Sequence, residues 1–141
     1  MKFTIPEALP GQNVLLRMHH AARTRLRKRV AWMVKVGLLE SGYRPGTPII
    51  ERCKIRITRQ CRRKLDPDSA PSSVKLILDV LQPLSKAFPD GLGIIANDSG
   101  KCIELLEVIQ KPGNGETIVE IECLDRVEEV MRLVGDWDAL L

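Results

Sequence analysis

The sequence predicts one α/β domain with a mixed β-sheet flanked by helices, on three observations. Cys53, Ile55 and Ile57 alternate with polar residues, which is the period of a half-buried strand. Apolar residues between about 20 and 41 recur at helical spacing, which predicts an amphipathic helix. Expected strands and helices alternate along the chain, an order typical of α/β folds. The 141 residues, 44% of them hydrophobic, suffice for one domain with a core, so we treat 1–141 as a single domain.

The N-terminal half is expected to contain a strand, a long helix and a second strand. Residues 2–5 are a short strand candidate that ends at Pro6. The helix predicted over about 20–41 stops at Gly42, and its inward positions are Leu26, Val30, Met33, Val34 and Leu38. In the strand that follows, the exposed face is expected to carry Lys54, Arg56 and Thr58.

The C-terminal half is expected to contain a helix, a β-hairpin and a last helix. Residues 65–71 are rich in turn formers, and Pro71 fits the first turn of a helix with apolar positions at Val74, Ile77, Leu78 and Leu81. Segments 102–110 and 117–124 are strand candidates, and the turn residues 111–115 between them predict a hairpin. A helix from Asp125 is expected to close the domain with Val127, Val130, Met131 and Val134 inward.

Charge is distributed unevenly along the chain. Residues 1–65 carry a formal balance of +13 and residues 66–141 a balance of −9, which together give the net +4. The two halves can neutralise each other across the fold, since a charge run is often a solvated face. A DNA phosphate backbone is the other partner that suits so basic a half, because each Lys or Arg contact releases condensed counterions.

Membrane and export classes are not expected. The longest apolar stretch, Ala31 to Leu39, is interrupted by Lys35 and is far shorter than the roughly 20 residues of a membrane span. The first residues lack the apolar core of a signal peptide, so a soluble cytoplasmic protein is expected. The cysteines Cys53, Cys61, Cys102 and Cys123 form no C-x-x-C pair, and reduced, buried thiols are the simplest interpretation.

Asp66 and Asp68 form the sharpest local motif, a D-x-D held in a proline-containing turn. Two such carboxylates can share one hard cation, although Asp68 or Ser69 could equally cap the helix that follows. Basic neighbours favour a site where a phosphodiester meets a metal, namely Arg62, Arg63, Lys64 and Lys75. Asp98, in an Asn-Asp-Ser-Gly turn, would supply a third carboxylate.

Three ordered blocks of the chain resemble the RusA-like Holliday-junction resolvases of phages and prophages. Residues 10–23 are similar to the family's N-terminal block, in which a proline turn leads to Asn, Arg and His before a basic helix. Residues 63–79 are similar to its metal block, D-P-D-N-x-x-P-x-x-K-x-x-x-D, and residues 93–99 to its block with paired aspartates. The chain departs from these patterns at Ser69, where Asn is usual, and at Asn97, where the first aspartate is usual.

The resemblance implies a RusA-like fold and a metal-dependent endodeoxyribonuclease that resolves four-way or branched DNA by paired phosphodiester hydrolysis. Asp66, Asp68 and Asp98 would bind Mg²⁺, with Mn²⁺ as an alternative ion. Lys75 would steady the scissile phosphate. Family members act as homodimers, because resolution needs two symmetry-related cuts. Bacterial cells, with or without a phage origin of the gene, are the implied setting.

Expected DNA contacts lie mainly in the basic half. Arg17 and Arg23 suit bidentate phosphate contact, and His20 could contact the junction or, with His19, cap a helix. The full set of expected DNA-binding residues is Asn13, Arg17, His20, Arg23, Arg27, Arg62, Arg63 and Lys64. Two alternatives stay open. One is a catalytically impaired or non-catalytic DNA-binding protein, and the other is an oligomeric scaffold whose basic and acidic halves pair between subunits. Trp32 and Trp137 are expected in the core or at a dimer interface.

Overall fold

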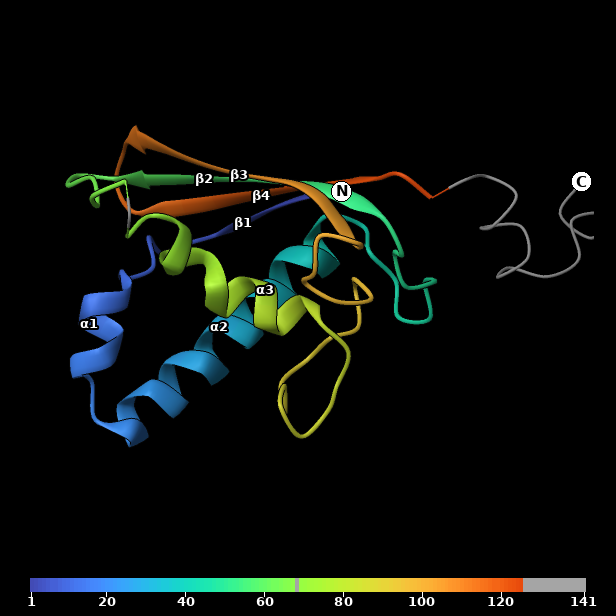
Figure 1. Cartoon of the computed structure of the whole chain (residues 1–141), viewed down its shortest axis with the longest axis horizontal. Helices are drawn as coiled ribbons and strands as arrows, with labels where there is room; N and C mark the ends of the chain where they lie inside the picture. The colour runs from blue at the N-terminus through green and yellow to red at the C-terminus, as the bar shows by residue number, and fades with distance from the viewer. Residues whose placement is uncertain (68, 126–141) are drawn as a thin grey trace, which may run out of the picture.

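The computed structural model describes residues 1–67 and 69–125. Its elements follow one another as strand, two helices, strand, a short 3₁₀ turn, helix and two strands (Figure 1). Their bounds are β1 Lys2–Ile5, α1 Gln12–Arg17, α2 His20–Glu40, β2 Cys53–Cys61, η1 Pro71–Val74, α3 Lys75–Leu81, β3 Ile103–Pro112 and β4 Glu116–Cys123. The predicted strands at 2–5 and 53–58 and the helices predicted over about 20–41 and from Pro71 are confirmed, with Pro71 in the first helical turn.

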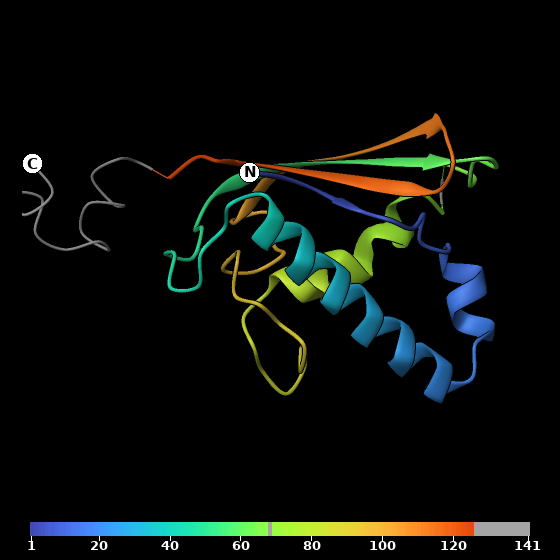
Figure 2. The same ribbon diagram turned by 180° about the vertical axis from the view of Figure 1, so that it is seen from behind.

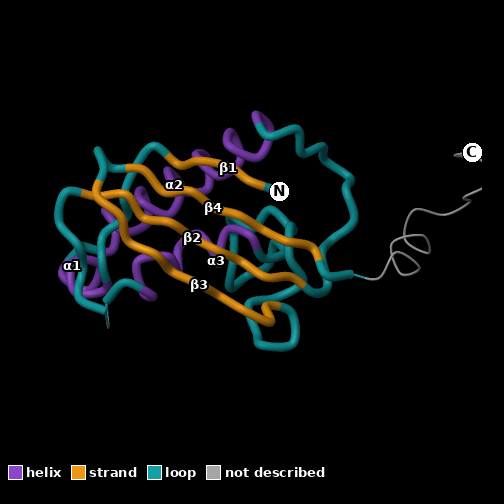
Figure 3. The backbone as a smooth tube through the Cα atoms, turned by 90° about the horizontal axis from the view of Figure 1, so that it is seen from above, coloured by secondary structure: helices purple, strands orange, loops and turns teal. Residues whose placement is uncertain are grey.

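The sheet is mixed, as predicted. Its strands lie in the order β1-β4-β2-β3, with β2 and β3 parallel and both other pairs antiparallel (Figure 3). All the described helices lie on one side of this sheet, and in Figures 1 and 2 no described helix covers its other side. The molecule is therefore a compact α/β domain of two layers.

The predicted hairpin of the last two strands is wrong. β3 and β4 each pair with β2, which lies between them. Their connection crosses the end of β2, where the Gly113 N–H donates to the Cys61 carbonyl at 3.3 Å. A Cβ at Gly113 would lie 2.7 Å from the Gln60 Cβ, so this crossing requires glycine. The turn residues therefore form a connection that crosses the end of β2, because β2 pairs with β3 along one edge and with β4 along the other.

The core lies between the sheet and the helices. α2 contributes Leu26, Val30, Val34 and Leu38 to it, which are all buried as the spacing predicts. Ile55 and Ile57 of β2 pack in the same cluster, and each such side chain contributes roughly 1.5–3 kcal/mol when fully buried. Gly37 lets α2 approach β1 closely, because a Cβ there would lie 3.1 Å from the Phe3 ring.

Three expectations about single residues change or stay open. Thr58 was expected on the exposed face but is buried, because Ile118 and Ile109 flank it across the neighbouring strands. Trp32 is 66% exposed, so it is not a core residue. Trp137 and the helix expected from Asp125, with Val127, Val130, Met131 and Val134, lie outside the described residues apart from Asp125 itself. None of the described helices combines the length and apolarity needed to cross a membrane.

Candidate nucleic-acid interface

A groove lies between the start of α2 and the η1–α3 segment. Figure 1 shows these elements on the helical side of the domain. Four residues predicted from the sequence line it, three from α2 (His20, Arg23, Arg27) and one from α3 (Lys75). The other lining residues are Leu15, Leu16, Ser72, Leu76 and Asp79. Apolar walls and several cations thus share one hollow.

The start of α2 orients the groove's basic side chains. His19 caps the helix, because its Nδ1 accepts the Ala21 N–H at 3.2 Å, and this leaves His20 as the groove histidine. Arg23 and Arg27 are four residues apart and therefore share one side of the helix. Arg27 also donates from Nη2 to the Thr24 hydroxyl at 3.3 Å, which restricts its guanidinium.

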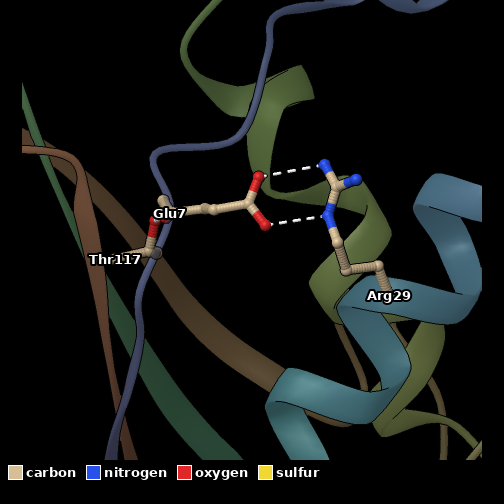
Figure 4. A network of polar contacts seen from close by, with 3 residues as sticks. All are labelled: Glu7, Arg29 and Thr117. Carbon is tan, nitrogen blue, oxygen red and sulfur yellow. Dashed lines mark hydrogen bonds and ion pairs between the residues drawn. The ribbon is translucent and has the colours of Figure 1, made fainter.

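Another arginine of α2 has a structural role. Arg29 donates from Nε and Nη2 to the two carboxylate oxygens of Glu7, at 2.8 and 3.0 Å (Figure 4). The Glu7 backbone carbonyl in turn accepts the Thr117 hydroxyl proton at 2.7 Å. These contacts link the helix to the segment after β1 and to β4. Of the basic residues of α2, Arg29 therefore supports the fold, whereas Arg23 and Arg27 line the groove.

Lys75 and Asp79 stand one turn apart on the α3 wall of the groove. The Lys75 Nζ lies 3.9 Å from the Asp79 Oδ1, and this oxygen is buried without a hydrogen-bond partner among the described residues. Burial raises the pKa of Asp79, the positive charges of Lys75 and Arg27 lower it, and the negative charge of Asp98 raises it further. Sequence reasoning gave Asp79 no role, although its spacing of four residues from Lys75 is the signal that places both on one helix face.

The D-x-D segment forms a turn at the end of β2, as predicted. The Asp66 carbonyl accepts the N–H groups of Ser69 and Ala70 at 2.9 and 3.0 Å, and Asp66 is exposed. The backbone of Leu65 exchanges two hydrogen bonds with the side-chain amide of Gln110 near the end of β3. Asp68 lies outside the described residues. No side chain caps η1, so capping by Ser69 is not observed.

Asp98 lies near the opposite end of the sheet. Its neighbour Ser99 accepts from the N–H groups of Cys102 and Ile103 at the start of β3. Gln110, beside Leu65, is seven residues further along β3, or roughly 23 Å at the rise of an extended strand. In Figures 1 and 3 the segment after β2 and the segment before β3 also lie at opposite ends of the sheet. The structure thus does not bring Asp66 and Asp98 together.

The remaining predicted residues lie outside the groove lining. Arg62, Arg63 and Lys64 are exposed in the segment that follows β2, next to Asp66. Asn13 and Arg17 are exposed on α1, whose Leu15 and Leu16 reach the groove instead. No three His, Cys, Asp or Glu side chains within residues 1–67 and 69–125 are arranged to hold a metal ion. Because Asp68 is not described, the Asp66, Asp68, Asp98 set stays a prediction that this arrangement does not support.

Sequence reasoning also gave no role to the buried arginine of β2. Arg59 is 7% exposed and donates to the backbone carbonyl oxygens of Leu9, at 3.0 Å, and Arg63, at 3.4 Å. It therefore holds the segment before α1 against the basic segment before Asp66. Its position in the alternation Cys53, Ile55, Ile57 points it inward, which is the signal that could have identified it.

Comparison with known proteins adds no assignment. No protein-family model matches the chain, and no curated protein matches it.

Proposed function

We propose that this chain is a magnesium-dependent endodeoxyribonuclease that resolves four-way or branched DNA junctions, and that the groove between α2 and α3 receives the DNA backbone. The observation that supports this is the convergence of His20, Arg23, Arg27 and Lys75 on one groove from segments about 50 residues apart. All four were predicted from the sequence to contact DNA or the scissile phosphate, and His20, Arg23 and Lys75 lie within the blocks that resemble the RusA-like family.

The charge of the groove suits a phosphodiester. Arg23, Arg27 and Lys75 provide three cations, and Asp79 is the one acid in the lining. Guanidinium groups match phosphate oxygens bidentately, while the lysine ammonium acts as a point charge. Leu15, Leu16 and Leu76 give the groove apolar walls that reduce solvent screening of these contacts. The paired cuts of a resolvase imply a homodimer that presents two such grooves.

A divalent ion would supply an activated water and neutralise charge on the phosphate. The described carboxylates do not form the expected ligand set, since Asp66 and Asp98 lie at opposite ends of the sheet. We therefore assign the groove residues to backbone binding and phosphate positioning, and derive no step that passes through the ion. The same placement favours a second candidate, a catalytically impaired or non-catalytic protein that recognises branched DNA.

Cleavage and binding assays separate the two candidates. A synthetic four-way junction and a linear duplex of the same sequence would be incubated with the protein in Mg²⁺ and in chelator. The variant is Lys75→Ala, and the matched control is Lys86→Ala, an exposed lysine outside the groove. Paired junction cuts that need Mg²⁺ and fall about 100-fold in Lys75→Ala, with the control unchanged, are expected of the nuclease.

The other outcomes are equally informative. Junction binding at nanomolar protein without cutting in either condition would replace the nuclease with the non-catalytic candidate. Absence of any preference for the junction over the duplex would contradict both. Light scattering at the same protein concentration measures the mass of the protein–junction complex. A complex that contains one protein chain would contradict the proposed homodimer.

A further inference from the structure

Three of the four cysteines meet at one end of the sheet, away from the groove. Cys53 begins β2, Cys102 directly precedes β3 and Cys123 ends β4. The Cys53 N–H donates to the Cys102 carbonyl at 2.8 Å, and the Cys102 thiol donates to the Ile50 carbonyl at 3.6 Å. Such a convergence of thiols from three separate segments is not required by the fold, because any small apolar residue packs at these positions.

Cys53 and Cys123 have the backbone geometry of a cross-strand disulfide. They are directly opposite each other in the antiparallel pair of β2 and β4. The adjoining hydrogen bond from the Leu124 N–H to the Arg52 carbonyl, at 2.8 Å, identifies this as a non-hydrogen-bonded pair. The Cα atoms of such pairs are about 4.5 Å apart, which falls within the range of roughly 4.4–6.8 Å seen in disulfides.

Access from solvent differs between the three thiols. Cys123 is exposed, because it lies on the helical side of the sheet beyond the end of the core. Cys53 and Cys102 are completely covered, at 0% and 1% exposure. A small disulfide in solution therefore reaches Cys123 first. Cys53 is the neighbouring thiol that can then attack a mixed disulfide formed at Cys123.

We propose that Cys123 and Cys53 are a reversible oxidation site for low-molecular-weight disulfides, and that its product is a Cys53–Cys123 bond joining β2 to β4. The Cys123 thiolate, its proton lost to solvent, attacks one sulfur of the reagent and displaces the first small thiolate. The Cys53 thiolate then attacks the Cys123 sulfur of this mixed disulfide and displaces the second. Two electrons leave the protein, and one small disulfide becomes two thiols.

The environment makes this oxidation slow. Burial raises the pKa of Cys53 to about 12, with further contributions from Cys102, Cys123 and Asp125. Burial also raises the pKa of Cys123, while the Asp125 backbone N–H and the N-terminal ammonium lower it. Thiolates are therefore scarce at neutral pH, and the second step depends on the proximity of the two sulfurs within one molecule.

The bond would fasten the point where the chain leaves the sheet. Just beyond Cys123, the Asp125 carboxylate accepts the N–H groups of Glu51 and Arg52 at 3.1 and 2.8 Å. Oxidation would add a covalent link to these hydrogen bonds. None of the three cysteines lines the α2–α3 groove, and the chemistry of the site does not depend on the proposed DNA activity.

The test uses the full chain and oxidised glutathione. After prolonged incubation under non-denaturing conditions, remaining thiols would be alkylated and the crosslinked peptides identified by mass spectrometry. We expect the free thiols to fall from the four of the reduced chain to two, with Cys53 joined to Cys123. The variants are Cys123→Ser and Cys53→Ser, and the control is Cys61→Ser at the other end of β2.

Each variant has a distinct expected product. Cys61→Ser should form the same bond as the wild type, Cys123→Ser should form no bond, and Cys53→Ser should stop at glutathione attached to Cys123. Dithiothreitol should return all wild-type thiols. A wild-type chain that accumulates only the mixed disulfide at Cys123, or that joins Cys53 to Cys102 instead, would overturn the proposal. Because these products are covalent, they are read in the wild type and Cys61→Ser even if Cys53→Ser fails to fold.

Discussion

The α2–α3 groove and the open face of the sheet are both rich in basic residues, but acidic partners lie opposite the basic residues of the sheet face and are absent from the two groove arginines of the described chain. On the open face, Lys54 lies opposite Glu122, and Arg56 lies between Glu120 and Glu107. The Arg56 Nε approaches Glu107 Oε2 to 3.2 Å. Of the ion pairs among the described residues, none involves Arg23 or Arg27 in the groove.

This difference divides the charge asymmetry of the sequence between two causes. The basic residues of β2 face acids contributed by the C-terminal strands, so the two halves of the chain do neutralise each other across the sheet. The basic residues at the start of α2 face a groove whose lining holds one half-buried acid, Asp79. A polyanion is therefore expected to bind at the groove and not at the sheet, even though both surfaces contribute to the same excess of positive charge.

Charge reversal gives the largest contrast between the two surfaces. Arg23→Glu with Arg27→Glu should weaken junction binding about 100-fold or more at low salt, because two phosphate contacts become repulsive. Lys54→Glu with Arg56→Glu changes the net charge equally but should weaken binding only a few-fold, through long-range field effects. Fluorescence anisotropy with a labelled four-way junction measures both affinities.

The salt dependence of the same titrations provides a second measurement. Loss of two phosphate contacts should reduce the slope of log affinity against log salt by about 1.8, whereas the open-face variant should keep the wild-type slope. Equal loss of affinity and of slope in both variants would show that net charge alone controls binding. It would contradict the groove as the specific site of DNA binding.

The acid in the groove gives a smaller effect on stability. The Asp79 Oδ1 is buried without a hydrogen bond, so Asp79→Asn should stabilise the fold by about 1 kcal/mol near neutral pH. Burial raises the pKa of Asp79, so the folded state disfavours its ionisation, and wild-type stability falls as pH rises through this folded value. The gain should therefore be present above the raised pKa and vanish as pH falls below the ordinary value of 3.8.

Urea unfolding at several pH values measures this gain. The wild type at low pH serves as the control, because Asp79 is then protonated in both the folded and the unfolded state. A gain that persists unchanged at low pH would mean that the substitution acts through packing and not through the charge.

Periodicity predicted α2 and η1–α3, which carry the charged side chains of the groove, but not α1, which carries Leu15 and Leu16. The apolar spacing of α2 and of η1–α3 follows from burial against one sheet face, so it can be detected within each segment of the sequence alone. Pro71 at the start of η1 and Gly42 after α2 mark helix ends for the same local reason. These elements could be predicted because each depends on one surface that the element itself displays.

Strand order and loop placement could not be predicted in this way. The turn residues 111–115 are typical of a hairpin, and nothing local shows that β2 lies between the strands they join. The parallel pairing of β2 and β3 then separates Asp66, after the end of one strand, from Asp98, before the start of the other. Arg59 is similar, because its carbonyl acceptors at Leu9 and Arg63 come together only in the folded chain.

The smallest effect is expected on the open face itself. A double-mutant cycle of Arg56→Ala and Glu107→Ala should give a coupling of about 0.2–1 kcal/mol, because both side chains are partly exposed and the pair is screened by solvent. The same cycle on Arg29 and Glu7, joined by two hydrogen bonds, should give a coupling at the upper end of this range. Chemical unfolding of seven proteins measures both couplings, because the two cycles share the wild type. If the Arg56 coupling were absent, the acids of β3 and β4 would still lower the local potential without forming a specific pair, and polyanion binding would still favour the groove. A coupling well above that of Arg29 and Glu7 would instead mean that the sheet face needs its charges for folding, so that matched charge there reflects stability and not the exclusion of a ligand.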